Sequence, residues 1–217
     1  MTLGAFERRL PKVFVIGLTR TGTTSVSRAL EVLGLSSAHW RNQYTGMLLD
    51  WEDFFFFDAC ADITVSALFE PLLRAFDGAR FILTERDGEP WVKSVSWHYD
   101  AATPQQLRYR LRRWPVLTHN GTGPEFETTA LFQLAHGTLY TAHDTWEAAY
   151  AAHHKRVMSA FEAMPERLLR IDLANEPQPW RALCRFLDRP EPSRDFPNVS
   201  WTRQAATRAP GTPLKPL

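Results

Sequence analysis

Hydrophobic residues along this chain follow two patterns that together are typical of a parallel sheet covered by helices. The run 12–17 is almost continuously apolar, as expected of a strand that is buried on both faces, and 80–84 and 167–171 are predicted as further strands. Between and after them, apolar residues recur at helical spacing over 23–34, 65–76, 89–99, 128–164 and 179–187. The order predicts an α/β fold of three layers, P-loop-like, with a central parallel sheet flanked by helices.

Some stretches do not fit either pattern cleanly. Phe54–Phe57 is too apolar for a surface loop, so it predicts a buried segment that leads to Asp58. Gly137 is expected to interrupt the long helical stretch. Residues 100–127 are expected to be less regular; their arginines indicate a solvated helix face, with an anion-attracting lip as the less favoured alternative: Arg108, Arg110, Arg112 and Arg113.

Length and composition favour a single domain over residues 1–217, of which about 190–217 form a proline-rich tail. The chain is 44% hydrophobic and 23% charged, which is ordinary for a globular protein. Its net charge of +1 gives no argument for nucleic acid or an anionic membrane as a partner. Any positive field must therefore be local.

Cysteine usage and the first residues favour a cytoplasmic protein. Cys60 and Cys184 are too few for a disulfide framework and predict two buried thiols in a reducing compartment. The start of the chain has no apolar signal region, and no run is long enough to span a membrane. His136 and His143 are seven residues apart, but without neighbouring carboxylates they indicate packing or surface positions more than metal ligands.

The first strand runs into a polar loop that is bounded by Gly17 and Gly22 and followed directly by a helix. Loop amides and the first turn of a helix can converge on an anion, so this arrangement predicts a phosphate site. The glycine spacing is that of a Walker loop. However, Thr23 stands where a nucleotide triphosphatase has its lysine, and the cation lies earlier, at Arg20.

The run Arg20-Thr21-Gly22-Thr23-Thr24-Ser25 resembles the loop of sulfotransferases that use 3′-phosphoadenosine-5′-phosphosulfate (PAPS). Residues 81–94 are similar to the family's second element, in which an arginine at a strand end is followed eight residues later by a serine. Here these are Arg86 and Ser94. The stretches 168–172, 180–187 and 196–197 are similar to a small branch of that family, so the resemblance covers most of the chain.

The resemblance implies a transferase that moves a sulfuryl group from PAPS to a hydroxyl or amine of a small-molecule acceptor and needs no metal. Arg20 to Ser25 would bind the 5′-phosphosulfate, and Arg86 with Ser94 the 3′-phosphate of PAPS or of its product PAP. The stretch 35–53 is expected to be irregular and is rich in aromatic residues. It is either a loop packed by its own rings or a wall of the acceptor pocket, which would suit an aromatic or apolar acceptor.

The acceptor hydroxyl must lose a proton, so a base is expected beside the phosphosulfate at the carboxyl end of a strand. Cytosolic relatives use a histidine a little over twenty residues before the 3′-phosphate arginine, and in that interval this chain has Asp62. Asp62 could also cap the helix that follows it. His98 and Asp58 are the alternatives, and His98 has the more convenient unperturbed pKa of ~6.5.

Two departures from the family pattern leave parts of the site open. Ser25 stands where many cytosolic relatives have the tryptophan that stacks on adenine, and Arg203 or Arg208 would have to replace a basic element near the C-terminus. A nucleotide or small-molecule kinase with a degenerate P-loop is the main alternative function, and a non-catalytic nucleotide-binding protein is the second. A Rossmann enzyme fits least, because Gly17-Leu18-Thr19 lacks the second glycine of that fingerprint.

Overall fold

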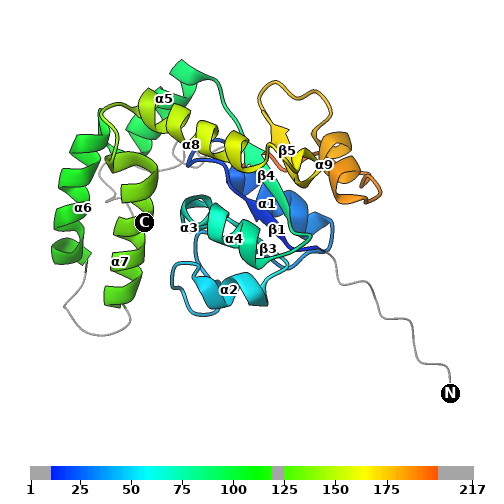
Figure 1. The fold of residues 1–217 in the computed structure, drawn as a ribbon, viewed down its shortest axis with the longest axis horizontal. Coiled ribbons are helices and arrows are strands. Elements are labelled where there is room, and N and C mark those ends of the chain that lie inside the picture. Colours follow the sequence, from blue (N-terminus) through cyan, green and yellow to red (C-terminus); the bar gives the residue numbers. More distant parts are fainter. Residues whose placement is uncertain (1–10, 119–124, 200–217) are drawn as a thin grey trace.

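The computed structural model describes residues 11–118 and 125–199, so Arg203, Arg208 and most of the predicted tail lie outside the described residues. Within these ranges, five parallel strands form one sheet in the order β2-β3-β1-β4-β5 (Figure 1). They are β1(Val13–Val15), β2(Ser37–His39), β3(Ala59–Ala61), β4(Arg80–Thr84) and β5(Leu168–Ile171). The predicted α/β class with a parallel sheet is confirmed.

The strand order grows in both directions from β1, which pairs with β3 on one side and with β4 on the other. Loops that follow such a central strand open at the carboxyl edge of the sheet, where ligands bind in folds of this kind. The glycine-bounded loop after β1 therefore lies at the topological switch point of the sheet, with β3 and β2 on one side of β1 and β4 and β5 on the other.

The strands predicted from apolar runs correspond to β1, β4 and β5, whereas β2 lies in the stretch that was expected to be irregular. That expectation was wrong for Ser37–His39. A strand of three residues made of Ser, Ala and His carries no hydrophobic alternation. Its strand character comes from pairing with β3, where Ala38 lies opposite Cys60.

Alternate residues of β1 face the two helical layers. Val13 and Val15 pack toward α1(Thr23–Val32) and α9(Pro179–Leu187), whereas Phe14 and Ile16 pack toward α2(Trp51–Phe56), α4(Phe69–Ala75) and α8(Trp146–Ala160). Both faces of the sheet are thus covered, which explains why β1 is apolar at every position.

The helix expected over 65–76 is divided into α3(Ile63–Ala67) and α4, with Leu68 between them. The expectation that 100–127 is less regular was wrong for Pro104–Thr118, which form the regular helix α6. Its described arginines, Arg108, Arg110 and Arg112, are exposed, and Arg110 pairs with Asp100 at 2.7 Å. These contacts agree with the solvated-face interpretation.

A second apolar layer lies beside the carboxyl edge of the sheet. It is formed by α5(Gly88–Tyr99), α6, α7(Glu125–His136), the π-helical turn η1(Gly137–Thr141) and the first turns of α8, and α6 and α7 extend away from the sheet (Figure 1). The predicted interruption at Gly137 is confirmed as η1. Beyond α8, the short 3₁₀ turn η2(Pro165–Arg167) leads into β5.

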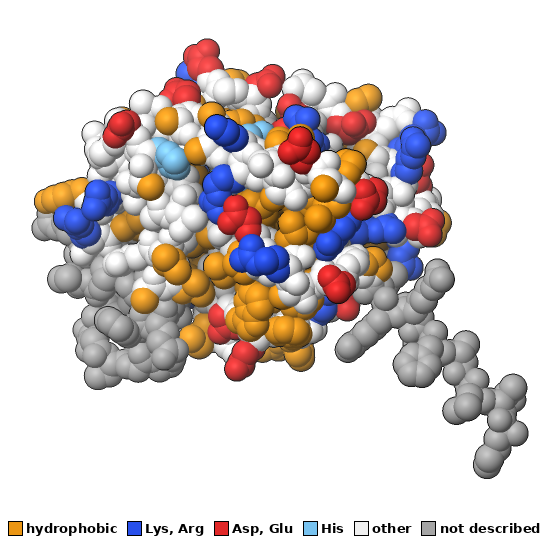
Figure 2. Space-filling view, in the orientation of Figure 1, with side chains coloured by type: hydrophobic (Ala, Val, Ile, Leu, Met, Phe, Trp, Pro, Cys, Tyr) orange, Lys and Arg blue, Asp and Glu red, His pale blue; other side chains and the backbone are white. Residues whose placement is uncertain are grey.

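The helix α2 connects β2 to the amino end of β3, so its aromatic residues lie away from the loop after β1. Lys12, which precedes β1, donates hydrogen bonds to the carbonyl oxygens of Phe55 and Phe57. Tyr44 stacks on Phe57, and Trp51 contacts Phe55. The rings pack on one another, but the prediction that Phe54–Phe57 is buried holds only for Phe54 and Phe57, because Phe55 and Phe56 are more than half exposed. Hydrophobic side chains are visible at the lower surface in Figure 2.

The two cysteines are both buried, as predicted. Among the described residues, 11–118 and 125–199, no helix is both long and apolar enough to cross a membrane. Charged side chains of both signs are interspersed on the face shown in Figure 2.

Candidate functional site

The loop after β1 is shaped by its two glycines for different reasons. A Cβ on Gly17 would lie 1.8 Å from Thr84 Oγ1 and 2.7 Å from Thr84 O, so the loop can pass the end of β4 only because residue 17 has no side chain. Gly22 has φ +107, a left-handed conformation, and precedes α1 directly. The chain can therefore turn into α1 with the first-turn amides of Thr23, Thr24 and Ser25 free of intrahelical partners.

The structure brings Arg20, Arg86 and Ser94 together. Arg20 Nε donates to Ser94 Oγ at 3.0 Å, and Arg86 Nη1 donates to the carbonyl oxygen of Arg20 at 3.3 Å. Burial, followed by the positive charge of Arg86, lowers the pKa of Arg20. In the described part of the chain neither arginine forms an ion pair with a carboxylate, and Glu89 instead pairs with Lys93 at 2.6 Å. Two adjacent guanidinium groups without a counter-ion are a strong attraction for an anion.

Two of the predicted loop residues use their side chains inside the protein. Thr21 is buried; its hydroxyl donates to Leu18 O and shares a hydrogen bond with Thr84 Oγ1, both at 2.6 Å. Ser25 Oγ accepts a hydrogen bond at 3.1 Å from the backbone N–H of Val199. Thr21 thus ties the loop to β4, and Ser25 ties α1 to the last described residues.

The hydroxyls of Thr23 and Thr24 converge on a histidine that the sequence did not single out as a site residue. His39 Nε2 lies 3.1 Å from Thr23 Oγ1 and 3.0 Å from Thr24 Oγ1. The same nitrogen is 3.7 Å from Asp62 Oδ2. Strands β2 and β3 end side by side, so the ends of two short strands bring His39 and Asp62 to the first turn of α1.

Asp62 stands at the N-terminal cap position of α3, but its side chain makes no capping hydrogen bond. Its backbone has φ +93, a region that is unfavourable for any residue with a side chain. Such strain persists only where the surrounding structure enforces it, and it is concentrated at functional sites. The carboxylate thus lies beside His39 and does not cap the helix that follows it.

The two alternative bases differ in position. His98 lies close enough to Arg20 and Asp62 for their charges to affect it, and burial, then Arg20, lowers its pKa from 6.5 to about 4, so it is a weaker base than its unperturbed value suggests. Asp58 precedes β3 at the amino end of the sheet, where its Oδ2 accepts hydrogen bonds from the N–H and hydroxyl of Ser36. Asp58 is thus not part of the group at the carboxyl edge.

Several residues of the site were not found by sequence reasoning. His39 was included only among the aromatic-rich stretch, and its strand carries no hydrophobic pattern. Tyr150 Oη accepts a hydrogen bond from the backbone N–H of Arg86 at 3.3 Å, and Tyr99 and Tyr140 contact the loop at Thr19. A tyrosine on the apolar face of a helix has the same sequence pattern whether its ring only packs in the core or its hydroxyl also forms a hydrogen bond to the loop.

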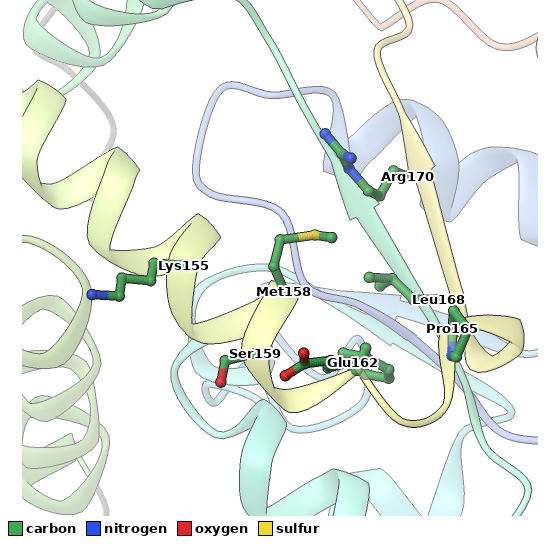
Figure 3. A pocket seen from close by; sticks show the side chains of 8 residues that line it. Lys155, Met158, Ser159, Glu162, Pro165, Leu168 and Arg170 are labelled. Carbon is green, nitrogen blue, oxygen red and sulfur yellow. The ribbon is translucent and has the colours of Figure 1, made fainter.

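A surface hollow lies elsewhere, between the second half of α8 and β5 (Figure 3). It contains none of the predicted site residues, and Arg170 at its edge pairs with Glu85 at 2.8 Å.

His136 is buried and forms hydrogen bonds with Phe132 O and Tyr99 Oη. Over residues 11–118 and 125–199, no cluster of His, Cys, Asp or Glu side chains could hold a metal ion.

Comparisons with known proteins show which family the chain belongs to. The sulfotransferase domain family matches residues 12–55 and 45–205. The Ava biosynthesis cluster protein M of Aspergillus versicolor is 25% identical over 222 residues, which cover 87% of this chain and 80% of that protein. Because the family match spans most of the sequence and includes the loop, Arg86 and Ser94, the chain belongs to the sulfotransferase domain family.

Proposed function

We propose that this protein is a metal-independent sulfotransferase that uses PAPS to sulfate a hydroxyl or amine of a small-molecule acceptor. The observation that carries the proposal is the pair Arg20 and Arg86, half-buried, in contact, and without a carboxylate partner in the described part of the chain. PAPS supplies the sulfuryl group and carries phosphates at both its 3′ and 5′ positions. Two cations and a free helix N-terminus are the donor set that such a ligand needs.

Different residues are proposed to bind the two ends of PAPS. Arg20 and the first-turn amides of Thr23 and Thr24 would bind the 5′-phosphosulfate, and Arg20 would stabilise the charge that develops on the leaving phosphate. Arg86 and Ser94 would bind the 3′-phosphate. Ser25 would contribute its backbone N–H, because its hydroxyl is already bonded to Val199.

Asp62 is proposed as the base that takes the acceptor's proton while the acceptor forms its bond to sulfur. Its carboxylate lies at the carboxyl end of β3, 3.7 Å from His39 Nε2. His39 touches both loop threonines and would fix the carboxylate relative to the loop. The lowered pKa of His98 supports Asp62 over His98 in this role.

The acceptor is proposed to be a small molecule, and a relative named for a biosynthesis cluster supports this class. Trp40 follows β2 at the carboxyl edge of the sheet and packs against the second apolar layer, so it is the aromatic side chain that we propose to line an apolar acceptor site. The aromatic residues of α2 pack together at the other end of the sheet and are not part of this proposal.

The alternatives predict a different ligand. A kinase would need a cation where Thr23 stands, but the side chain of Thr23 is buried against His39. Binding of PAP, AMP and ADP, each with and without Mg²⁺, separates the possibilities. We expect PAP to bind at least about tenfold more tightly than AMP, since the second phosphate adds charge-assisted hydrogen bonds, and to do so without Mg²⁺.

Equal affinity for PAP and ADP, or strict dependence on Mg²⁺, would overturn the proposal. A panel of phenols, alcohols and amines incubated with PAPS then tests transfer directly. Tight binding of PAP without any turnover across a broad panel would favour the non-catalytic alternative.

A further inference from the structure

Thr19 in the loop after β1 is bonded through all of its polar groups to aromatic side chains from the helical layer beside the sheet. Its N–H donates to Tyr140 Oη at 2.9 Å, and its carbonyl accepts from Trp91 Nε1 at 2.9 Å. Its hydroxyl shares a hydrogen bond with Tyr99 Oη at 3.1 Å. Each polar group of Thr19 therefore already has a partner within the protein.

The direction of the hydroxyl bonds follows from a buried histidine. His136 Nδ1 lies 2.7 Å from Phe132 O, which can only accept, so this nitrogen carries the proton. His136 Nε2, 3.2 Å from Tyr99 Oη, must then accept from Tyr99, provided the ring is neutral. Burial lowers the pKa of His136 to about 3, which keeps the ring neutral near pH 7. Tyr99 Oη consequently accepts its second hydrogen bond from the hydroxyl of Thr19.

The aromatic residues that contact Thr19 are deeply buried, so water cannot easily replace a bond that is lost. Trp91 and Tyr140 are 0% exposed and Tyr99 is 8% exposed. Tyr140 belongs to η1, and single π-helical turns inside helical segments frequently occur at functional sites. A buried donor without a partner is unfavourable, so these bonds restrict the backbone of Thr19 strongly.

The residue that follows Thr19 is Arg20, which has φ +73 although it is not a glycine. This conformation is unfavourable and needs support from its neighbours. Thr19 is fixed on one side, and on the other side Arg86 Nη1 donates to the carbonyl of Arg20. The backbone of Arg20 is thus held before any ligand arrives.

We propose that Tyr99, Tyr140 and Trp91 are positioning residues that clamp Thr19 and thereby preorganise Arg20 for the transferring group. This inference rests on the proposed function for its catalytic part. The clamp itself is a property of the protein without ligand, so the two can be tested separately.

The first experiment measures hydrogen exchange of the loop amides in the full-length protein without ligand. Tyr140→Phe keeps the ring but removes the acceptor of the Thr19 N–H, and we expect that amide to exchange at least about tenfold faster. Tyr44→Phe, at a 72% exposed position near α2, is the matched control and should leave the loop unchanged. Unchanged exchange in Tyr140→Phe would overturn the clamp, whatever the protein binds.

The second experiment combines Tyr140→Phe with Arg20→Ala. If Tyr140 acts through Arg20, its substitution should lower kcat by about tenfold in the wild type but by less than about twofold when Arg20 is absent, because effects of coupled residues are not additive. The loss of thermal stability should be similar in both backgrounds. Equal kcat losses in the two backgrounds would show a merely structural role and overturn the positioning role.

A third variant covers the case in which Tyr140→Phe does not fold. Thr19→Val keeps the shape and loses the hydroxyl, so it should leave PAP affinity within about threefold while lowering kcat. A large loss of PAP affinity would mean that Thr19 is itself a ligand residue, against the proposal. Faster loop exchange in Tyr140→Phe combined with no PAP binding by any of the proteins would refute the proposed function and leave the clamp standing.

Discussion

Arg20 Nε donates a hydrogen bond to Ser94 Oγ at 3.0 Å across 74 residues of sequence. One partner belongs to the loop after β1, and the other lies on α5, which follows β4. Because each was assigned by the family resemblance to a different phosphate of one ligand, their contact connects the two halves of the proposed site. A substitution of either residue should therefore affect the binding of both phosphate groups.

Arg20→Ala should lower kcat by about 10²–10³ with a smaller effect on PAP affinity, as expected for loss of a preorganised donor to a developing charge. Arg20→Lys should recover only part of the activity, because lysine cannot reproduce the Nε donor to Ser94. Steady-state kinetics and PAP titrations measure both quantities. Arg112→Ala, at an exposed position of α6, is the control. Unchanged kcat with weakened PAP binding would assign Arg20 to ground-state binding.

Arg86→Ala should remove most of the preference for PAP over AMP, since these two nucleotides differ only in the 3′-phosphate. The expected loss is about tenfold or more in PAP affinity, with AMP affinity little changed. Isothermal titration with both nucleotides checks this, and Arg74→Ala, an exposed arginine on α4, serves as the control. If AMP and PAP weaken equally, Arg86 contacts a group that the two ligands share.

Asp62→Asn should retain the fold and PAP affinity but lose turnover by at least about 10² if the carboxylate is the base. The amide keeps the shape of the side chain and cannot accept the acceptor's proton. His98→Ala and His39→Ala are tested beside it, with PAP binding as the measure of an intact loop. Near-wild-type transfer by Asp62→Asn together with inactive His98→Ala or His39→Ala would move the assignment to that histidine.

Stability should fall as the pH is lowered from about 6.5 toward 4. Burial lowers the pKa of His98 to about 4, of His136 to about 3 and of His153 to about 4. In this pH window the unfolded chain binds protons that the folded protein does not, so the free energy of unfolding decreases with acidification. The expected loss is on the order of a few kcal/mol. Urea unfolding at pH 7 and pH 5 measures it.

Replacing one of these histidines by glutamine should flatten this pH dependence while it lowers stability at pH 7. His153→Gln is a suitable variant, because glutamine can still donate to the carbonyl of Ile16, which His153 Nε2 contacts at 2.8 Å. A pH dependence as steep as that of the wild type would show that His153 does not contribute.

The sequence by itself determined those strands, helices and loops that depend on interactions between residues close together along the chain. Short apolar runs predicted β1, β4 and β5, and the spacing of apolar residues with a proline at the start predicted α9 over Pro179–Leu187. The glycine-bounded loop with Arg20 could be found from its spacing, whereas Arg86 and Ser94 were assigned through the family resemblance. Loops of this kind need particular residue types at fixed intervals, so the sequence carries the signal.

Tertiary structure decided the features that depend on pairing between distant segments. A three-residue strand such as β2 has no periodicity to detect, so neither the strand nor His39 beside Thr23 could be predicted. Thr19 and Tyr140 are 121 residues apart, and nothing in the pattern around Tyr140 distinguishes a packed ring from one whose hydroxyl fixes the loop. Hydrogen bonds between side chain and backbone form wherever the fold brings partners together, and that proximity exists only after the sheet and its helices have packed.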